Sequence, residues 1–128
     1  MKIINQYQKG QTLVTVLIFV IIAITLTTGA IAMTVVNSQT ASSFDRSNQA
    51  YGVAESGAEN AVLQLLRNPG YTGETLSVGG DSATISVSGS NPYTIVSSGR
   101  SGGFVRKIEV TADYTGGVLT VLTWKEID

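Results

Sequence analysis

The longest charge-free stretch of the chain, residues 10–44, lies near the N-terminus and separates Lys9 from Asp45. Within it, the run from Leu13 to Val36 is LVTVLIFVIIAITLTTGAIAMTVV, which is mostly apolar. These about 24 residues, at about 1.5 Å of rise per helical residue, would cover a hydrocarbon core of roughly 30 Å. The run therefore predicts a helix that can span a bilayer.

Three classes of protein carry such a run near the N-terminus: a secreted protein with a cleavable signal, an ordinary single-pass membrane protein, and a protein cut on the amino-terminal side of its apolar segment. A secretory signal has an apolar region of roughly 7 to 15 residues, whereas this run is longer and continues into a polar helix. Lys2 and Lys9 precede the run, and the positive-inside rule then places everything after Asn37 outside the cytoplasm. The two remaining classes therefore share one orientation.

The junction before the apolar run favours the third class. A polar leader, MKIINQYQKG, ends at Gly10, and Gln11 to Val14 lead directly into the apolar stretch. In these residues the chain resembles the type IV pilin and pseudopilin superfamily. The resemblance implies that a membrane-embedded prepilin peptidase cuts after Gly10 and that the new amino terminus, Gln11, is methylated. A glycine suits such a cleavage site because it has no side chain and can adopt an extended backbone.

Thr15 departs from the pattern of that superfamily. Major pilins usually carry a glutamate at the fifth mature position, which is Thr15 when counted from Gln11. A carboxylate buried in hydrocarbon is costly, so the glutamate is interpreted as a functional group that pairs with a neighbouring subunit's amino terminus. Thr15 carries no charge, and we expect its hydroxyl, like those of Thr25, Thr27 and Thr28, to bond back to its own helix. Because some minor pilins and pseudopilins lack this carboxylate, the resemblance implies a minor or tip subunit.

The segment after the apolar run, residues 37–68, has the pattern of an amphipathic helix that continues the first helix. One stripe of apolar residues recurs at steps of three and four: Tyr51, Ala54, Ala58, Ala61, Val62, Leu65 and Leu66. Residues 50–61, AYGVAESGAENA, resemble the A-x-x-A-E-x-G-x-E-x-A helix that follows the membrane segment in minor pilins and pseudopilins. Glu55 and Glu59 share one helical face, and two such carboxylates can serve acid/base or metal chemistry. Because the chain has no histidine or cysteine to act with them, we favour a solvated helix face or a contact with a neighbouring subunit. We expect one helix from Thr12 to Arg67.

The remainder of the chain, residues 69–128, predicts a small sheet. Pro69 removes a backbone donor and, with Gly70, ends the helix. Apolar and polar residues then alternate in several short runs, separated by Gly79-Gly80, Asn91-Pro92, Gly102-Gly103 and Gly116-Gly117. The expected fold class is α+β, with a long N-terminal helix packed on an antiparallel sheet of about four to five strands. In the last run, residues 118–127, Leu119 and Val121 alternate out of step with Leu122 and Trp124, so its register stays open.

Composition excludes several kinds of chemistry. The chain has no cysteine and no histidine, which excludes disulfides, thiol nucleophiles, Ser-His-Asp triads and the usual zinc ligand sets. A net charge of −1, with scattered basic residues, lacks the basic surface of a nucleic-acid binder. No Asp-x-Asp-x-Asp calcium loop is present, and the glycine-rich residues 99–103 are expected to form a hairpin loop instead of a phosphate cradle. We therefore expect no enzymatic activity, no cofactor, no metal and no nucleic-acid partner.

Taken together, the patterns divide the chain into a leader (1–10), a transmembrane or filament-core helix (11–36), an amphipathic extension (37–68) and an antiparallel β head (69–128). The resemblance implies a structural subunit of a type IV pilus or related filament. Its expected partners are other pilin subunits, membrane lipid, the prepilin peptidase and an assembly platform. The expected location is the cytoplasmic membrane, with the head outside the cytoplasm, and then a cell-surface filament.

Two other hypotheses stay open. One is an uncut single-pass membrane protein that presents a small extracytoplasmic β-rich binding module. The other is a secreted β domain, freed by cleavage beyond the apolar run. Whether a pilin-like apparatus serves adhesion, motility, DNA uptake or secretion depends on partners and motors encoded elsewhere.

Overall fold

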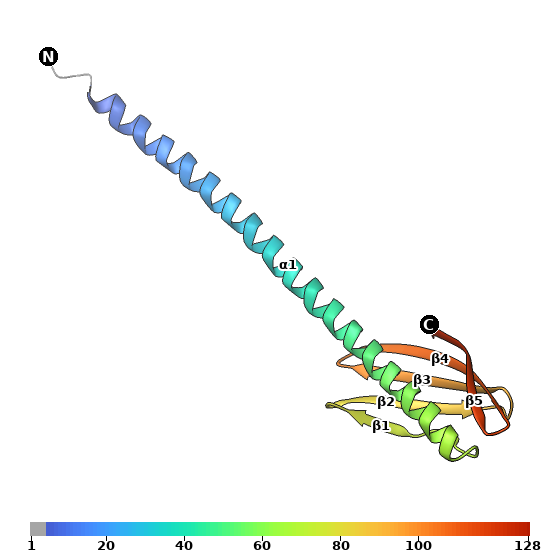
Figure 1. The fold of residues 1–128 in the computed structure, drawn as a ribbon. Coiled ribbons are helices and arrows are strands. Elements are labelled where there is room, and N and C mark those ends of the chain that lie inside the picture. Colours follow the sequence, from blue (N-terminus) through green and yellow to red (C-terminus); the bar gives the residue numbers. More distant parts are fainter. Residues whose placement is uncertain (1–4) are drawn as a thin grey trace. The chain divides into compact units, whose positions relative to one another are not determined.

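The computed structural model of the chain describes the backbone from Asn5 to Asp128 and the side chains from Gly10 onward. Residues 1–4, which are the first part of the expected leader and include Lys2, lie outside the described residues, as does the Lys9 side chain. The described chain forms one helix followed by five strands (Figure 1). Residues up to Ala41 and residues from Ser42 onward form two compact units, and each is described by itself.

The first unit contains the N-terminal part of helix α1, which runs from Asn5 to Arg67. The predicted end of this helix at Arg67 is confirmed, but its predicted start at Thr12 is wrong. The leader contains no proline, and Gly10 alone costs a long helix only about 1 kcal/mol. Helical residues on both sides of Gly10 therefore carry the helix back to Asn5.

Five antiparallel strands follow the helix and form a single sheet in the order β1-β2-β3-β4-β5. The strands are β1 (Thr75–Val78), β2 (Asp81–Ser88), β3 (Tyr93–Ser101), β4 (Phe104–Thr115) and β5 (Val118–Ile127). Each strand pairs with the next one in sequence, so the sheet is a meander, as the turn residues predict. The predicted α+β fold class, with a helix packed on four to five antiparallel strands, is confirmed.

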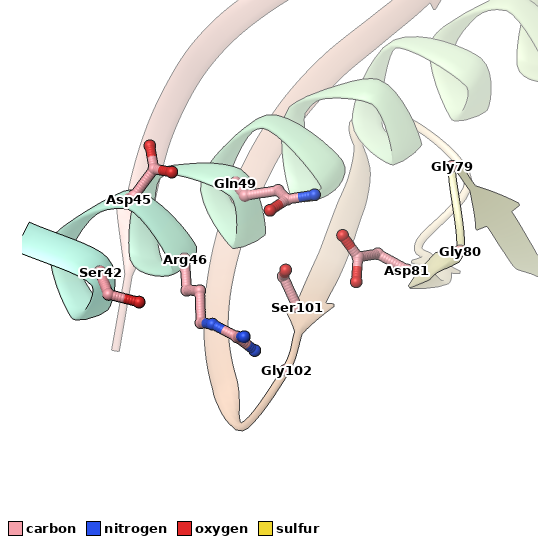
Figure 2. A pocket seen from close by; sticks show the side chains of 9 residues that line it. All are labelled: Ser42, Asp45, Arg46, Gln49, Gly79, Gly80, Asp81, Ser101 and Gly102. Carbon is pink, nitrogen blue, oxygen red and sulfur yellow. The ribbon is translucent and has the colours of Figure 1, made fainter. Parts of the chain in front are cut away.

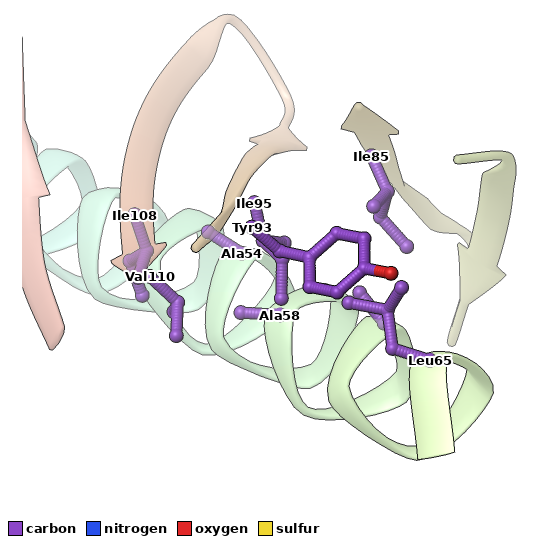
Figure 3. Packing of buried hydrophobic residues seen from close by; sticks show 9 residues of the cluster. Ala54, Ala58, Leu65, Ile85, Tyr93, Ile95, Ile108 and Val110 are labelled. Carbon is purple, nitrogen blue, oxygen red and sulfur yellow. The ribbon is translucent and has the colours of Figure 1, made fainter. Parts of the chain in front are cut away.

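The second unit buries its core between one face of the sheet and the C-terminal part of α1 (Figure 3). The cluster of fully or nearly buried residues is Ala54, Ala58, Ala61, Leu65, Ile85, Tyr93, Ile95, Ile108 and Val110. Most of the predicted helical stripe therefore faces the sheet. Leu66 is an exception at 45% exposed, whereas Ala50, which is fully buried, was not part of the predicted stripe.

The helix approaches β3 closely because the side chains beneath it become smaller along that strand. The helix-facing residues of β3 are Tyr93, Ile95, Ser97, Gly99 and Ser101, and all are buried. At Gly99 a Cβ atom would lie 2.2 Å from the Ala50 carbonyl oxygen and 2.3 Å from the Ala54 amide nitrogen. At Gly57 of the helix a Cβ atom would lie 2.3 Å from the Ser97 hydroxyl oxygen. The helix and the strand thus come closest at two points where one of the facing residues is a glycine.

This close approach corrects the prediction that residues 99–103 form a hairpin loop. Gly99, Arg100 and Ser101 belong to β3, and Gly99 pairs with Ala83 of β2 and Arg106 of β4. The turn between β3 and β4 is confined to residues 102–103. Glycine at position 99 therefore reflects the nearness of the helix backbone and not a turn.

A β-bulge explains the ambiguous register of the last strand. Thr111 pairs with Thr123 and Ala112 pairs with Val121, so Leu122 of β5 has no partner on β4. An extra residue of this kind reverses the alternation beyond it. Leu119 and Val121 before the bulge and Trp124 after it consequently share the sheet face that α1 covers elsewhere.

Polar contacts fix the end of the helix against the sheet. The Asn60 amide nitrogen and the Tyr71 hydroxyl each donate to Glu74 Oε1, at 2.9 Å and 3.0 Å. Partial burial, followed by the hydrogen bond to the Glu74 carboxylate, raises the pKa of Tyr71 to about 12. The Tyr93 hydroxyl donates to the Pro69 carbonyl oxygen over 3.1 Å, just beyond the last helical residue. These bonds hold the segment that leads from the helix into β1.

Candidate functional site

The apolar surface of α1 in the first unit is the most extensive candidate interaction surface in the described chain. Every described side chain from Gly10 to Ala41 is exposed. Leu13 is 72% exposed, Phe19 74% and Met33 74%. This helix is long and apolar enough to cross a membrane. The transmembrane helix predicted from the sequence is therefore supported.

Threonine hydroxyl groups of this helix donate hydrogen bonds to backbone carbonyl groups of the same helix. Thr15 Oγ1 donates to the Gln11 carbonyl oxygen over 2.9 Å. Thr25, Thr27 and Thr28 make the same bond to carbonyl groups one turn earlier, with distances from 2.7 to 3.0 Å. The predicted bonding of these hydroxyl groups to their own helix is confirmed. Thr15 consequently offers a neighbouring helix a methyl group and no charge.

Gly10 and Gln11, the two residues of the predicted cleavage junction, lie within the helical part of the backbone. Gly10 is exposed, and a Cβ atom built on it would meet nothing within 4 Å. The described residues thus leave the Cβ position of Gly10 open. A peptidase that needs an extended substrate would have to unwind this turn, which glycine eases by its low helix propensity.

A second group of residues gathers around Arg106 in the other unit. The guanidinium donates from Nε to Glu126 Oε1 on β5, and from its Nη1 atom to the Ser47 hydroxyl on α1 over 2.7 Å. Its central carbon lies 5.9 Å from the centre of the Tyr51 ring. The hydrogen bond from Arg106 lowers the pKa of the Glu126 carboxyl group. Arg106 thus ties three elements together, and its charge is already paired.

Lys107, the next residue of β4, points to the opposite face of the sheet. Its Nζ atom donates to the Asp128 carbonyl oxygen over 2.9 Å. The predicted separation of Arg106 and Lys107 by strand alternation is therefore confirmed. These neighbouring cations do not combine into one basic surface.

A third feature is a pocket of about 650 Å³ in the unit that begins at Ser42 (Figure 2). It is called the turn-end pocket below. Alternate turns of a meander lie at the same end of the sheet, so the β1–β2 turn at Gly79-Gly80 and the β3–β4 turn at Gly102 both border it. Side chains of α1 between residues 42 and 49 form the opposite wall. Asp81 at the start of β2 and Ser101 at the end of β3 form its floor.

The turn-end pocket is lined mainly by polar groups. Figure 2 shows the Ser101 hydroxyl, the Asp81 carboxylate and the Gln49 amide directed into one space. The Arg46 guanidinium lies over Gly102, where a Cβ atom would come within 2.4 Å of its Nη1 atom. A side chain at position 102 would push Arg46 away, and the positive φ of 55° also favours glycine there.

Metal binding has no support among the residues that the structure describes. No group of three or more histidine, cysteine, aspartate or glutamate side chains is positioned there to hold a metal ion. The acidic residues of β2, β4 and β5 are not gathered in one strand: Asp81 begins β2, Asp113 lies near the end of β4, and Glu126 and Asp128 lie at and just after the end of β5. Glu55 and Glu59 have no ion-pair partner within residues 10–128.

The turn-end pocket could not be identified from the sequence. Its residues come from a helix, two turns and two strand ends, and no local motif joins them. The sequence pattern that indicates one of these residues is strand alternation: Ser101 lies two residues beyond Gly99 and therefore on the same, helix-facing side of β3. Comparisons of the chain with protein families, curated proteins and solved structures found no match.

Proposed function

We propose that this protein is a structural subunit of a type IV pilus or related pilin-like filament, processed after Gly10 and assembled through its apolar helix. The observation that carries the proposal is the exposed apolar surface of α1, which continues in the same helix into a segment packed on a small sheet. Such a helix can insert in a bilayer before assembly and pack among other apolar helices afterwards. Its partners are other pilin subunits, the prepilin peptidase and the assembly platform.

Within that class, a minor or tip subunit is the role that the residues favour. Thr15 occupies the position where the major subunits usually carry a glutamate, and its hydroxyl is already bonded to the Gln11 carbonyl group. It therefore supplies no carboxylate to pair with the amino terminus of a neighbouring subunit. A subunit used once or a few times at a filament end does not need that pairing along the whole filament.

The proposal places the protein first in the cytoplasmic membrane, with the β-rich unit outside the cytoplasm, and then in a cell-surface filament. The two lysines before the apolar run are the basis for this orientation. No catalytic role is proposed, because the chain has no histidine or cysteine and the Arg106 charge is paired with Glu126.

Cleavage at the junction tests the proposal. The chain is co-expressed with a prepilin peptidase, and the product in the membrane fraction is compared for the parent and for Gly10→Val. We expect the parent to be shortened and Gly10→Val to stay uncut, because a branched side chain at the cleaved bond fills the space that glycine leaves open for close approach of the peptidase. Gly29→Val is the matched control: Gly29 also has nothing within 4 Å of a built Cβ atom, and cutting should proceed.

An uncut parent chain would contradict the proposal. It would favour the alternative, a single-pass membrane protein that presents its β-rich unit as a binding module. A soluble product that lacks the whole apolar run would favour a secreted β domain.

A further inference from the structure

The turn-end pocket contains the hydroxyl group of a largely buried residue, Ser101. Ser101 is 4% exposed, and its hydroxyl makes no hydrogen bond to any other part of the described chain. Figure 2 shows that this hydroxyl points into the pocket between Gln49 and Asp81. The hydroxyl is open to the pocket and available to a ligand there, because a serine hydroxyl can both donate and accept. A ligand hydroxyl in the pocket could both donate to and accept from Ser101.

The charged groups of the pocket are also uncommitted. Asp81 and Arg46 both line it, yet neither takes part in an ion pair with residues in the described range. The guanidinium of Arg46 offers a planar set of donors, and the Asp81 carboxylate offers two acceptor oxygens. The Gln49 amide supplies a donor and an acceptor from the helix wall. Donors and acceptors of fixed, planar geometry thus surround one polar space.

These groups fit a neutral ligand that carries several hydroxyl groups. Each hydroxyl of a sugar ring both donates and accepts, and two adjacent hydroxyls match the spacing of a carboxylate or a guanidinium fork. An anion would meet the carboxylates of Asp45 and Asp81, which also line the pocket. A metal ion would find fewer than the three acidic ligands that a site usually needs. A volume of about 650 Å³ suits one or two sugar rings.

We propose that the turn-end pocket is a binding site for a neutral saccharide, held by Ser101, Asp81, Gln49 and Arg46. This inference goes beyond the proposed filament function and does not depend on it. The described lining contains no aromatic side chain on which a sugar could stack, so binding rests on hydrogen bonds alone. Dissociation constants of about 1 to 20 mM are expected for such a site.

The test uses nuclear magnetic resonance on the full chain, labelled with ¹⁵N, in dodecylphosphocholine micelles. This detergent is chosen because its head group is not a sugar and cannot compete for the pocket. Glucose, galactose, mannose and N-acetylglucosamine are titrated separately. We expect at least one of them to shift the amide signals of Gly79, Gly80 and Gly102 with saturation, because these glycines border the pocket. The amides of Gly116 and Gly117, at the opposite end of the meander, should not move.

Two variants assign the shifts to the pocket. Asp81→Asn keeps the shape of the side chain and removes its charge, and it should weaken binding at least about tenfold. Gln49→Ala, on an exposed helical position that alanine suits, should also weaken binding. Glu59→Gln is the control, because Glu59 is an exposed helical carboxylate that does not line the pocket. It should bind as the parent does.

Four results would overturn the inference. They are the absence of saturable shifts with all four saccharides, equal shifts at Gly116 and Gly117, parental affinity in both Asp81→Asn and Gln49→Ala, and saturation of the pocket glycine signals by calcium chloride alone. The last result would make the pocket a cation site. The glycine signals themselves report whether each variant is folded.

Discussion

Replacement of Gly99 by alanine is the sharpest test of the way in which the helix packs on the sheet. The added Cβ atom would lie 2.2 Å from the Ala50 carbonyl oxygen, 2.3 Å from the Ala54 amide nitrogen and 2.8 Å from the Ala54 Cα atom. All three are backbone atoms of the helix, so no side-chain rotation can relieve the clash. Gly99 is itself held by its neighbours on β2 and β4, Ala83 and Arg106.

The clash can be relieved only by moving the helix and the strand apart. Ordinary contact begins at 3.4 Å, so the backbones would have to separate by about 1 Å. A gap of this size loses roughly a quarter to a half of the dispersion energy of each contact across it. Overpacking a core typically costs about 1 to 3 kcal/mol, and we expect Gly99→Ala at the top of that range or above, about 3 kcal/mol or more. The melting temperature should fall by about 12 °C or more.

The assay is denaturant unfolding of the full chain in detergent, followed by the fluorescence of Trp124. The chain has a single tryptophan, which lies on β5, so the signal reports the β-rich unit and not the apolar helix. Gly52→Ala is the control: Gly52 lies in the same helix with nothing within 4 Å of a built Cβ atom, and it should stabilise by about 0.5 to 1 kcal/mol. A Gly99→Ala variant as stable as the parent would refute the proposed close approach.

Two further predictions concern the same unit. In the same unfolding assay, Ser97→Ala should leave stability unchanged or raise it by about 1 kcal/mol. The reason is that the Ser97 hydroxyl is fully buried and has no hydrogen-bond partner in the described chain. A loss of stability above about 1 kcal/mol would mean that this hydroxyl is hydrogen-bonded. Glu126 has a lowered pKa because Arg106 donates to it, so its contribution to stability is present above the ordinary value of 4.5 and is lost as the pH falls through the lowered native value. The stability difference between the parent and Glu126→Gln should therefore shrink on acidification, and a difference that does not change with pH would contradict the pairing. The Arg106 and Glu126 side chains are both more than a third exposed, at 35% and 38%, so solvent screens the pair and the effect on stability should be small.

The sequence was sufficient to predict the order of the main elements. The charge-free apolar run indicates the first helix, and Pro69 indicates where the helix ends. The strands are indicated by alternation of apolar and polar residues. β1 was not identified because its four residues are too few to show a period. The predicted start of the helix at Thr12 was wrong, because the low helix propensity of Gly10 does not outweigh the helical residues on both sides of it.

Other features depended on tertiary contacts that no local pattern contains. Gly99 has the appearance of a turn residue in the sequence, but its role follows from the approach of a helix some 45 residues earlier in the chain. The bulge at Leu122 depends on the pairing of β5 with β4. The turn-end pocket, likewise, exists only after the meander has brought two glycine turns to one end of the sheet. The interpretation of Gly10, Gln11 and Thr15 rests on the resemblance and stays a prediction.

The central claim, that this chain is processed after Gly10 and enters a filament, is tested most directly on filaments sheared from the surface of the cell that produces the protein. The amino-terminal sequence and intact mass of this chain are measured in that fraction. The account predicts a chain that begins at Gln11 and carries one methyl group on its amino terminus. A chain that begins at Met1 and is found only in the membrane fraction would contradict it.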